Sequence, residues 1–448
     1  MKEKEGSSGT MVSQNELTVA ATGDSMISRQ ISVLREEEFL SVIKVLQNAD
    51  VAFTNCEILF HNYESFPMKT TGFATFMAAD PSMAEELKWA GFNLLALPNN
   101  HTMDYGHYGM FSTMGTLDKL KMTYAGAGRS LDEAGEPKYL ETEKGRVALV
   151  ASCADPSPLV ELWQRATNAR GGVMARPGIN MIRLDCHYVV GKKAFENLKE
   201  VKRELKMSDP EGKKHLEPDE LMFADRKFKQ GDKVGCYKVP KKQDVERDLL
   251  SIKDARRAAD WVFVSLHSHG GSVTGSEYPD DFICQYARDC IDAGADAFLG
   301  HGPHILRGIE IYKGKPIFYS LGQFIVQNDT VRRISSEQYE LFGLDEKARP
   351  SDFYEARRGI IPPTEPPQAQ WWSESIIATF SFKQGRLREI KLYPITFYGE
   401  SRTSAGCPKM AKAEQARGII EHLRDISAPW ATQIDYKAGI GVVKLPVD

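Results

Sequence analysis

Residues 93–109 read NLLALPNNHTMDYGHYG, an apolar run that changes abruptly into polar residues and glycine. The apolar half follows a helix-like stretch, PSMAEELKWAGF (81–92), whose glycine suits a helix C-cap, and it predicts a buried strand. The polar half then places Asn100, His101 and Asp104 at the carboxyl end of that strand. Packing gives a buried strand no reason to end in these side chains, so we interpret them as part of a metal site.

Strand-like and helix-like segments alternate along most of the chain, which predicts an α/β fold. Each polar cluster follows the carboxyl end of a predicted strand, where ligand sites of α/β sheets occur. The predicted strands include ELTVAATGD (16–24), DVAFTNCE (50–57), WVFVSLHSH (261–269), two strands around a Lys-Gly turn (307–321) and a hairpin (374–395). The predicted helices cover residues 37–49, 81–92, 107–121, 245–260, 278–295 and 408–425.

Composition excludes several classes of protein. The formal net charge of −4 over 448 residues argues against nucleic acid as the main partner. No run reaches the ~18 apolar residues of a membrane span, and the polar start MKEKEGSSGTMVSQNE has no signal-peptide core. Seven dispersed cysteines without a CxxC pair fit reduced thiols. We therefore expect a cytoplasmic protein, unless a leader has been removed from this sequence; the oligomeric state stays open.

Five predicted strand ends carry side chains of the types that serve as metal ligands in proteins. They are TGDS with Asp24, TNCE with Asn55 and Glu57, PNNHTMD with Asn100, His101 and Asp104, LHSH with His267 and His269, and GHGPH with His301 and His304. Carboxylates can bridge two cations, an amide oxygen fills a further position, and imidazoles select metals such as Zn, Mn or Fe. Taken singly, each cluster is explained equally well by a turn or by surface residues. Their joint position predicts a metal site.

With these residues in place, the chain resembles the CapA family, which is linked to capsular poly-γ-glutamate synthesis. The resemblance is carried by VAATGDSMI, ADVAFTNCE, LLALPNNHTMDYG, VFVSLHSHGG and DAFLGHGPHILRGIEIYKGKPIFYSLGQF, which occur in this order within residues 16–325. It implies a metallophosphatase (calcineurin-like) fold, a four-layer α/β/β/α sandwich with insertions. The family often has Asn where this chain has Gln323.

The resemblance also implies roles for individual residues. Two divalent metal ions (Mn, Zn, Fe or Co) would be bound by Asp24, Glu57, Asn100, His267, His301 and His304, with Glu57 as the bridge. His101 would act beside the substrate as an acid or electrophile, oriented by Asp104, although Asp104 also suits a helix N-cap. His269 departs from the usual His-Trp-Gly of the family, so it is either an added ligand or a catalytic or substrate-contacting residue.

Two further residues are candidates for substrate binding. Arg176 lies in ARPGINMIR (175–183), which resembles a stretch of a CapA-like subgroup, and its guanidinium suits a substrate carboxylate. A simple Pro-Gly turn explains the same stretch equally well. Asn55, at the strand end TNCE, is the second candidate.

Two stretches interrupt the α/β alternation and predict insertions. We expect the first to continue as a Lys/Glu-rich helical segment that covers the core. The predicted organisation is a disordered tail (1–14), a core (15–154 and 246–400), an inserted cap (155–245), a second insertion (327–372) and a C-terminal helix and tail (401–448).

Three functions fit these features. The first is hydrolysis of an amide or ester bond in an anionic peptide or poly-γ-glutamate-type substrate by metal-activated water. The second is epimerisation of a peptide, of the lasso-peptide type, in which a Cα proton is removed and returned, with His101 and His269 as the candidate groups. The third is a non-catalytic polymer-binding component of capsule synthesis. The full set of candidate ligands favours an enzyme.

Overall fold

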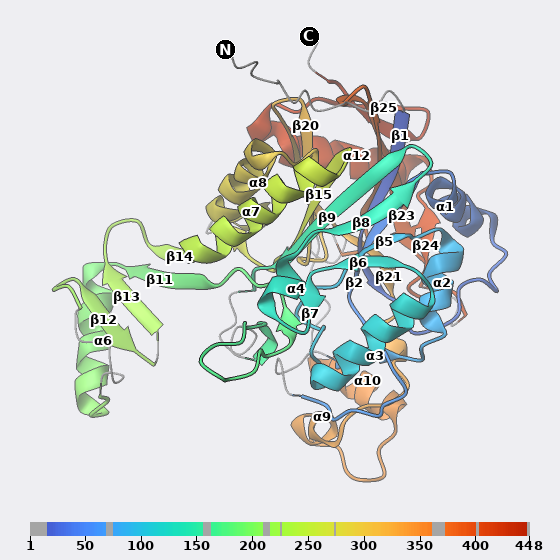
Figure 1. Cartoon of the computed structure of the whole chain (residues 1–448). Helices are drawn as coiled ribbons and strands as arrows, with labels where there is room; N and C mark the ends of the chain where they lie inside the picture. The colour runs from blue at the N-terminus through green and yellow to red at the C-terminus, as the bar shows by residue number, and fades with distance from the viewer. Residues whose placement is uncertain are drawn as a thin grey trace, which may run out of the picture.

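Two β-sheets face each other at the centre of the molecule (Figure 1). The computed structural model describes residues 16–68, 75–155, 163–208, 216–224, 226–272, 275–360, 372–399 and 403–445. The predicted tail at residues 1–14 lies outside these ranges. Within them, no helix is both long and apolar enough to cross a membrane.

The first sheet has ten strands around a parallel centre. The parallel strands are β1 (Glu16–Met26), β2 (Val51–Cys56), β5 (Leu94–Ala96) and β6 (Thr123–Ala125), with β21 (Gln323–Val326) beside the end of β1. The antiparallel part contains β22 (Ser375–Lys383), β23 (Arg386–Phe397), β24 (Pro408–Met410), β25 (Ile434–Lys437) and β26 (Ile440–Val443).

The second sheet has six strands in the order β19-β20-β18-β15-β9-β8. Its four inner strands are parallel, namely β9 (Gly145–Cys153), β15 (Trp261–His267), β18 (Ala297–His301) and β20 (Lys315–Leu321). Its antiparallel edges are β8 (Lys138–Thr142) and β19 (Leu306–Tyr312).

Helices cover the outer faces of both sheets. The first sheet is covered by α1 (Glu37–Gln47), α2 (Met83–Ala90) and α3 (Gly106–Lys119), and the second by α7 (Lys242–Ala258) and α8 (Asp281–Ala293). α12 (Ala413–Ser427) packs its apolar residues into the layer between the sheets at one end. The predicted α/β/β/α sandwich of the metallophosphatase type is confirmed.

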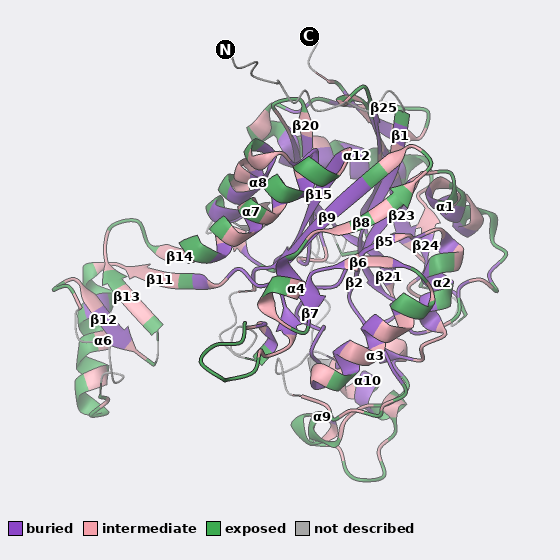
Figure 2. Cartoon of the chain, viewed as in Figure 1, coloured by how far each residue is buried: buried purple, intermediate pink, exposed green. Residues whose placement is uncertain are grey.

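Alternating side chains explain why the strands are buried on both faces. In β15, Trp261 and Phe263 point into the layer between the sheets, whereas Val262 and Val264 pack against the helices outside. Both sets of side chains are buried, which explains why the sequence of this strand is an almost continuous apolar run. Figure 2 shows the same pattern, with buried residues concentrated in the two sheets and exposed residues on the outer sides of the helices.

The first insertion is richer in strands than we expected. Residues 184–240 form a small four-stranded sheet that projects from the core, with one helix (Figure 1). Its elements are β11 (Leu184–Val190), α6 (Lys192–Glu204), β12 (Glu220–Phe223), β13 (Arg226–Gln230) and β14 (Gly235–Pro240). The prediction of a mainly helical segment is therefore wrong, because aromatic and β-branched residues such as Tyr188 and Phe228 alternate with the lysines and pair across strands.

The first and last strands of this small sheet are neighbours. Leu184 of β11 pairs with Pro240 of β14, and the Lys241 amide donates to the Arg183 carbonyl at 2.8 Å. The insertion therefore leaves the core and returns to it at nearly the same point.

The two later irregular segments also contain regular structure. The second insertion includes η1 (Asn328–Thr330), α9 (Ser336–Leu341) and α10 (Pro350–Ile360), and its proline-rich part, 361–371, lies outside the described residues. The C-terminal segment is more than a helix and a tail, because β24, β25 and β26 pair with β23 or with each other and extend the first sheet.

Short elements connect these layers. They are β3 (Leu59–Phe60), β4 (Ala78–Ala79), β7 (Ala127–Gly128), α4 (Leu131–Gly135), β10 (Gly178–Ile179), β16 (Gly271–Ser272), β17 (Gly275–Pro279) and η2 (Ala428–Trp430).

One close approach holds the two sheets together where the polar loops begin. A Cβ atom added to Gly23 would lie 1.9 Å from the carbonyl oxygen of Gly322, and the Asp24 amide donates to that same oxygen at 3.1 Å. Only glycine fits at position 23, so the residue before Asp24 fixes the distance between β1 and the loop after β20.

We expect Gly23→Ala to lower the free energy of unfolding by about 3 kcal/mol or more, because the methyl group forces the backbone apart. Gly418→Ala is the control: this exposed helical glycine has open space around its Cβ position, so alanine should stabilise by about 0.5–1 kcal/mol. Urea unfolding followed by circular dichroism measures both changes. Equal stability of Gly23→Ala and the wild type would show that the contact is not tight.

Candidate metal centre

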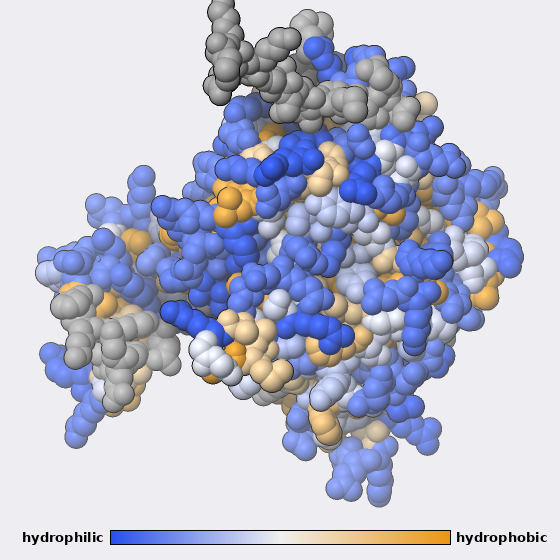
Figure 3. Space-filling view, viewed as in Figure 1, coloured by the Kyte–Doolittle hydropathy of each residue, from blue (hydrophilic) through white to orange (hydrophobic). Residues whose placement is uncertain are grey.

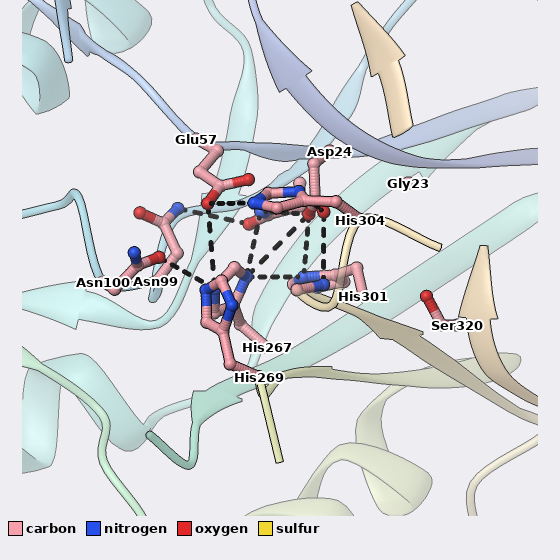
Figure 4. A network of polar contacts seen from close by, with 12 residues as sticks. Gly23, Asp24, Glu57, Asn99, Asn100, His267, His269, His301, His304 and Ser320 are labelled. Carbon is pink, nitrogen blue, oxygen red and sulfur yellow. Dashed lines mark hydrogen bonds and ion pairs between the residues drawn. The ribbon is translucent and has the colours of Figure 1, made fainter. Parts of the chain in front are cut away.

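Four proposed ligands come from strands that are adjacent or nearly so. Asp24, near the end of β1, is in register with Asn55 of β2 after a local register shift, and Glu57 follows two residues later. His267 and His301 are the last residues of β15 and β18 and pair directly in the second sheet. The carboxyl ends of both sheets thus bring their polar residues to one place (Figure 4).

Several hydrogen-bond donors surround the Asp24 carboxylate. Its Oδ1 accepts from Asn55 Nδ2 at 2.8 Å, and its Oδ2 accepts from the Gly302 amide at 3.2 Å and lies 3.0 Å from His304 Nδ1. Burial alone would raise the pKa of Asp24, but hydrogen bonds with His301 and His304 outweigh burial and hold that pKa well below its usual value. Asp24 is therefore a buried, charged oxygen donor.

Glu57 has the opposite environment. Both carboxylate oxygens are buried and have no hydrogen-bond partner among the described residues. Burial, and then the neighbouring charges of Asp24 and Asp104, raise the pKa of Glu57 well above its usual value. An unpartnered buried carboxylate is costly, whereas a bound cation removes the cost, so this residue fits a metal ligand.

His267 lies between two groups of potential ligands. Its Nδ1 is 3.1 Å from His301 Nδ1, and its Nε2 is 2.9 Å from Asn100 Oδ1 and 3.2 Å from His269 Nε2. Burial, and then the charge of His269, lower the pKa of His267 well below its usual value, which keeps the imidazole neutral. Neutral imidazole nitrogens that face each other at such distances suit a shared cation better than direct hydrogen bonding.

His269 joins the same cluster from the loop after β15. Its ring lies 5.0 Å from that of His267 and 5.4 Å from that of His304, centroid to centroid. Desolvation by the surrounding cluster, and then the charge of His304, lower its pKa to about 3, although part of the residue is exposed. The structure therefore places His269 among the potential ligands.

Three sets of ligand atoms, each within 4.8 Å of one another, could hold a cation. They are Asp24, His267 and His301; Glu57, His267 and His269; and Asp24, Glu57 and His304. Because Asp24, Glu57 and His267 each belong to two sets, the donors are suited to more than one cation at close range. Their chemistry, carboxylate oxygen with neutral imidazole, fits a divalent transition metal.

The loop that carries His304 is held in an unusual conformation. His304 has φ = +59°, which costs a non-glycine residue roughly 1–2 kcal/mol, and Gly302 has φ = +114°. A Cβ on Gly302 would lie 2.8 Å from the Ser268 amide nitrogen. This strained turn aims the His304 ring at Asp24, and strain of this kind is typical of functional sites.

Two supporting residues were not predicted from the sequence. Ser265 Oγ lies 2.7 Å from His301 Nε2, which fixes the ring so that Nδ1 faces Asp24 at 3.5 Å. Asn99 accepts the His101 amide and donates to the Cys56 carbonyl, which ties the loop after β5 to the loop after β2. Ser265 lies two residues before His267 on the same strand face, but its partner His301 belongs to another strand, so no local signal identified it.

His101 and Asp104 form a pair beside the cluster. His101 Nδ1 is 2.6 Å from Asp104 Oδ2, which also accepts the Met77 amide at 2.7 Å. Asp104 does not cap α3, whose N-cap residue is Tyr105 and whose cap position makes no side-chain hydrogen bond. The Asp104 carboxylate therefore orients the imidazole and leaves its Nε2 available.

The two predicted substrate-binding residues lie in different surroundings. Asn55 is fully buried and donates to Asp24, so it faces the candidate ligands rather than solvent. Arg176 is outside the cluster, and its Nε donates to the Arg165 carbonyl at 3.1 Å. Their roles toward substrate stay predictions.

Comparison with known proteins identifies the family. The model of the bacterial capsule synthesis protein PGA_cap matches residues 18–328. The uncharacterized protein y4sH of Sinorhizobium fredii is 33% identical over 98% of this chain and 95% of its own length. The PGA biosynthesis protein CapA of Bacillus subtilis is 26% identical over 73% of this chain and 69% of its own length.

A more distant relative matches a shorter part. A probable polyglutamine synthesis accessory protein of Mycobacterium tuberculosis is 27% identical over 52% of this chain and 45% of its own length. The PGA_cap match contains Asp24, Glu57, Asn100 and the four clustered histidines. The chain therefore belongs to the PGA_cap family of bacterial capsule synthesis proteins, as its resemblance to CapA predicted.

Proposed function

We propose that the chain is a metal-dependent enzyme that hydrolyses an amide or ester bond in an anionic, glutamate-rich peptide or polymer. The observation that carries this proposal is the pair of buried Glu57 oxygens, which lie among imidazoles and accept no hydrogen bond from the described residues. A scaffold gains nothing from such a cluster without a cation. The names of the Bacillus relatives, which refer to PGA and capsule biosynthesis, support a glutamate polymer as the substrate class.

Two divalent cations, Mn, Zn, Fe or Co, would be held by Asp24, Glu57, Asn100, His267, His301 and His304, with His269 as an additional donor. When bound, such cations supply Lewis-acid stabilisation of negative charge and lower the pKa of water. Asn55, Ser265 and the Gly302 amide hold the ligand side chains in place by the contacts described above.

His101 is the proton-transfer group in this proposal. Asp104 accepts from its Nδ1, so Nε2 is the atom that holds or donates a proton at the leaving group. The pair lies close enough to the cluster that the charge of Asp104 contributes to the pKa of Glu57 and the charge of His101 to that of His269.

Epimerisation at Cα is the second candidate. It is favoured by the presence of two imidazoles, His101 and His269, that adjoin the cluster from different loops. A polymer-binding role in capsule synthesis is the third, supported by the word "accessory" in the name of the Mycobacterium relatives. The three alternatives give different products, or none, from one substrate.

We expect the purified protein to bind one to two divalent transition metals per chain. Glu57→Gln should reduce that metal content by about 10-fold or more, because the glutamine amide lacks the negative charge of the carboxylate. Glu86→Gln is the matched control, since this buried carboxylate accepts the Ile31 and Ser32 amides away from the cluster. Plasma mass spectrometry after reconstitution measures both. A metal-free wild type would refute the proposed centre.

We expect His101→Ala to retain its metals and to lose about 10²–10⁴-fold in kcat on a γ-glutamyl peptide, the range for removal of a general acid. His187→Ala, in the small sheet, should change neither quantity. Metal content and initial rates are measured on the same preparations. Loss of metal in His101→Ala would mean that His101 is a ligand.

Incubation of a γ-glutamyl peptide in D₂O separates the candidate reactions. Hydrolysis should yield shorter peptides in the mass spectrum, whereas epimerisation should add deuterium at Cα without cleavage. We expect cleavage. Unchanged peptide that nevertheless co-elutes with the metal-loaded protein would favour the polymer-binding role.

A further inference from the structure

Four arginines gather where the small sheet joins the core, and two of them are already neutralised. Arg183 forms a two-pronged ion pair with Asp244, with Nε 2.7 Å from Oδ2 and Nη2 3.0 Å from Oδ1. Arg247 reaches Asp244 Oδ1 at 3.0 Å and Asp248 Oδ1 at 3.2 Å. Asp244 and Asp248 therefore compensate Arg183 and Arg247.

The remaining two, Arg165 and Arg176, are only weakly compensated by the carboxylates of the described residues. Arg165 Nη2 lies 3.9 Å from Asp244 Oδ1, an oxygen that already accepts from two other guanidiniums. The Nε of Arg165 is buried and has no acceptor among the described residues. Arg176 directs its Nε to the carbonyl of Arg165, and no carboxylate in the described part of the chain pairs with it.

This surplus of positive charge is costly without an anion. Burial, and then the charge of Arg183, lower the pKa of Arg165, yet a guanidinium does not lose its proton in a protein. Both side chains are only partly exposed, so water does not fully replace the missing acceptors. A planar oxyanion that accepts two hydrogen bonds would satisfy them.

The same two arginines are linked to the candidate metal centre. Gln164, which precedes Arg165, donates to the Asn100 carbonyl at 2.7 Å. Arg176 precedes Pro177, whose carbonyl accepts from the His107 ring, and its charge is close enough to affect the pKa of His107. The segment 164–177 therefore contacts the loop that carries Asn100 and His101 at one end, and helix α3, which follows that loop, at the other.

We propose that Arg165 and Arg176 form a carboxylate-binding subsite beside the candidate metal centre, which holds a second acidic group of the substrate. The proposal rests on the proposed function and deepens it: it assigns the substrate class as a chain with repeated carboxylates. Such a substrate binds here through one side-chain carboxylate while a neighbouring bond reaches the centre. The subsite discriminates glutamyl from glutaminyl chains, because an amide offers no negative charge.

Figure 3 shows the hydropathy of one face of the molecule. The described residues on it are mostly hydrophilic, with small separate hydrophobic areas. Binding that depends on ion pairs at a partly exposed site weakens with added salt, which gives the proposal a second signature.

The test is calorimetric titration of the full-length, metal-loaded protein with a γ-linked glutamate decamer. We expect the Arg165→Gln/Arg176→Gln double variant to bind at least 10-fold more weakly than the wild type, and the salt dependence to be reduced. Arg170→Gln is the matched control, because this exposed arginine lies on the turn of the same hairpin and removes the same charge. It should bind like the wild type.

The outcomes separate this inference from the proposed function. If the metal-loaded wild type and the metal-loaded double variant bind the decamer with equal affinity, the proposed subsite is overturned. The proposed metal centre is not affected by that result. A wild type without metal would refute the proposed function first. If the double variant unfolds, the single variant Arg176→Gln is titrated instead. Among the described residues, the Arg176 side chain donates to the Arg165 carbonyl, so its replacement disturbs few contacts. Inorganic phosphate that binds more tightly than the decamer, with the same arginine dependence, would overturn the choice of a carboxylate.

Discussion

The burial of two carboxylates next to each other is the constraint around which this structure is arranged. Asp24 and Glu57 come from neighbouring segments of one sheet, and both are withdrawn from water. Asp24 is compensated by an amide, a backbone N–H and two imidazoles, whereas Glu57 accepts no hydrogen bond from the described residues and has only the more distant His267 and His304 nitrogens, at 3.9 and 3.8 Å. Close negative charges in a medium of low polarity repel strongly, so Glu57 either holds a proton, as its raised pKa indicates, or binds a cation.

The sandwich supplies the geometry that this constraint requires. Parallel strands in both sheets end on the same side, so five loops converge although they are far apart in sequence. The close contact of Gly23 with Gly322 sets the separation of the sheets at that point, and the strained turn at His304 brings the last imidazole into reach. Packing and the candidate chemistry therefore depend on the same few backbone positions.

The sequence predicted the parts of this molecule that have local signals. Apolar runs followed by polar residues located the ends of the strands that carry Asp24 and His267, and both lie in the cluster. Ser265 was missed because its partner, His301, is on another strand, and only the parallel register of β15 and β18 brings them together. The small sheet was mistaken for helix because its strands are short and rich in lysine, as in β13, so the few apolar residues that alternate with the lysines give only a weak strand signal.

The entry and exit of the small sheet have a consequence for the evolution of this fold. Because Leu184 and Pro240 are paired neighbours, a chain that lacked residues 184–240 would need only a tight turn to continue from one core segment to the next. The small sheet can therefore be gained, lost or exchanged as a unit without disturbing the strand ends of the core.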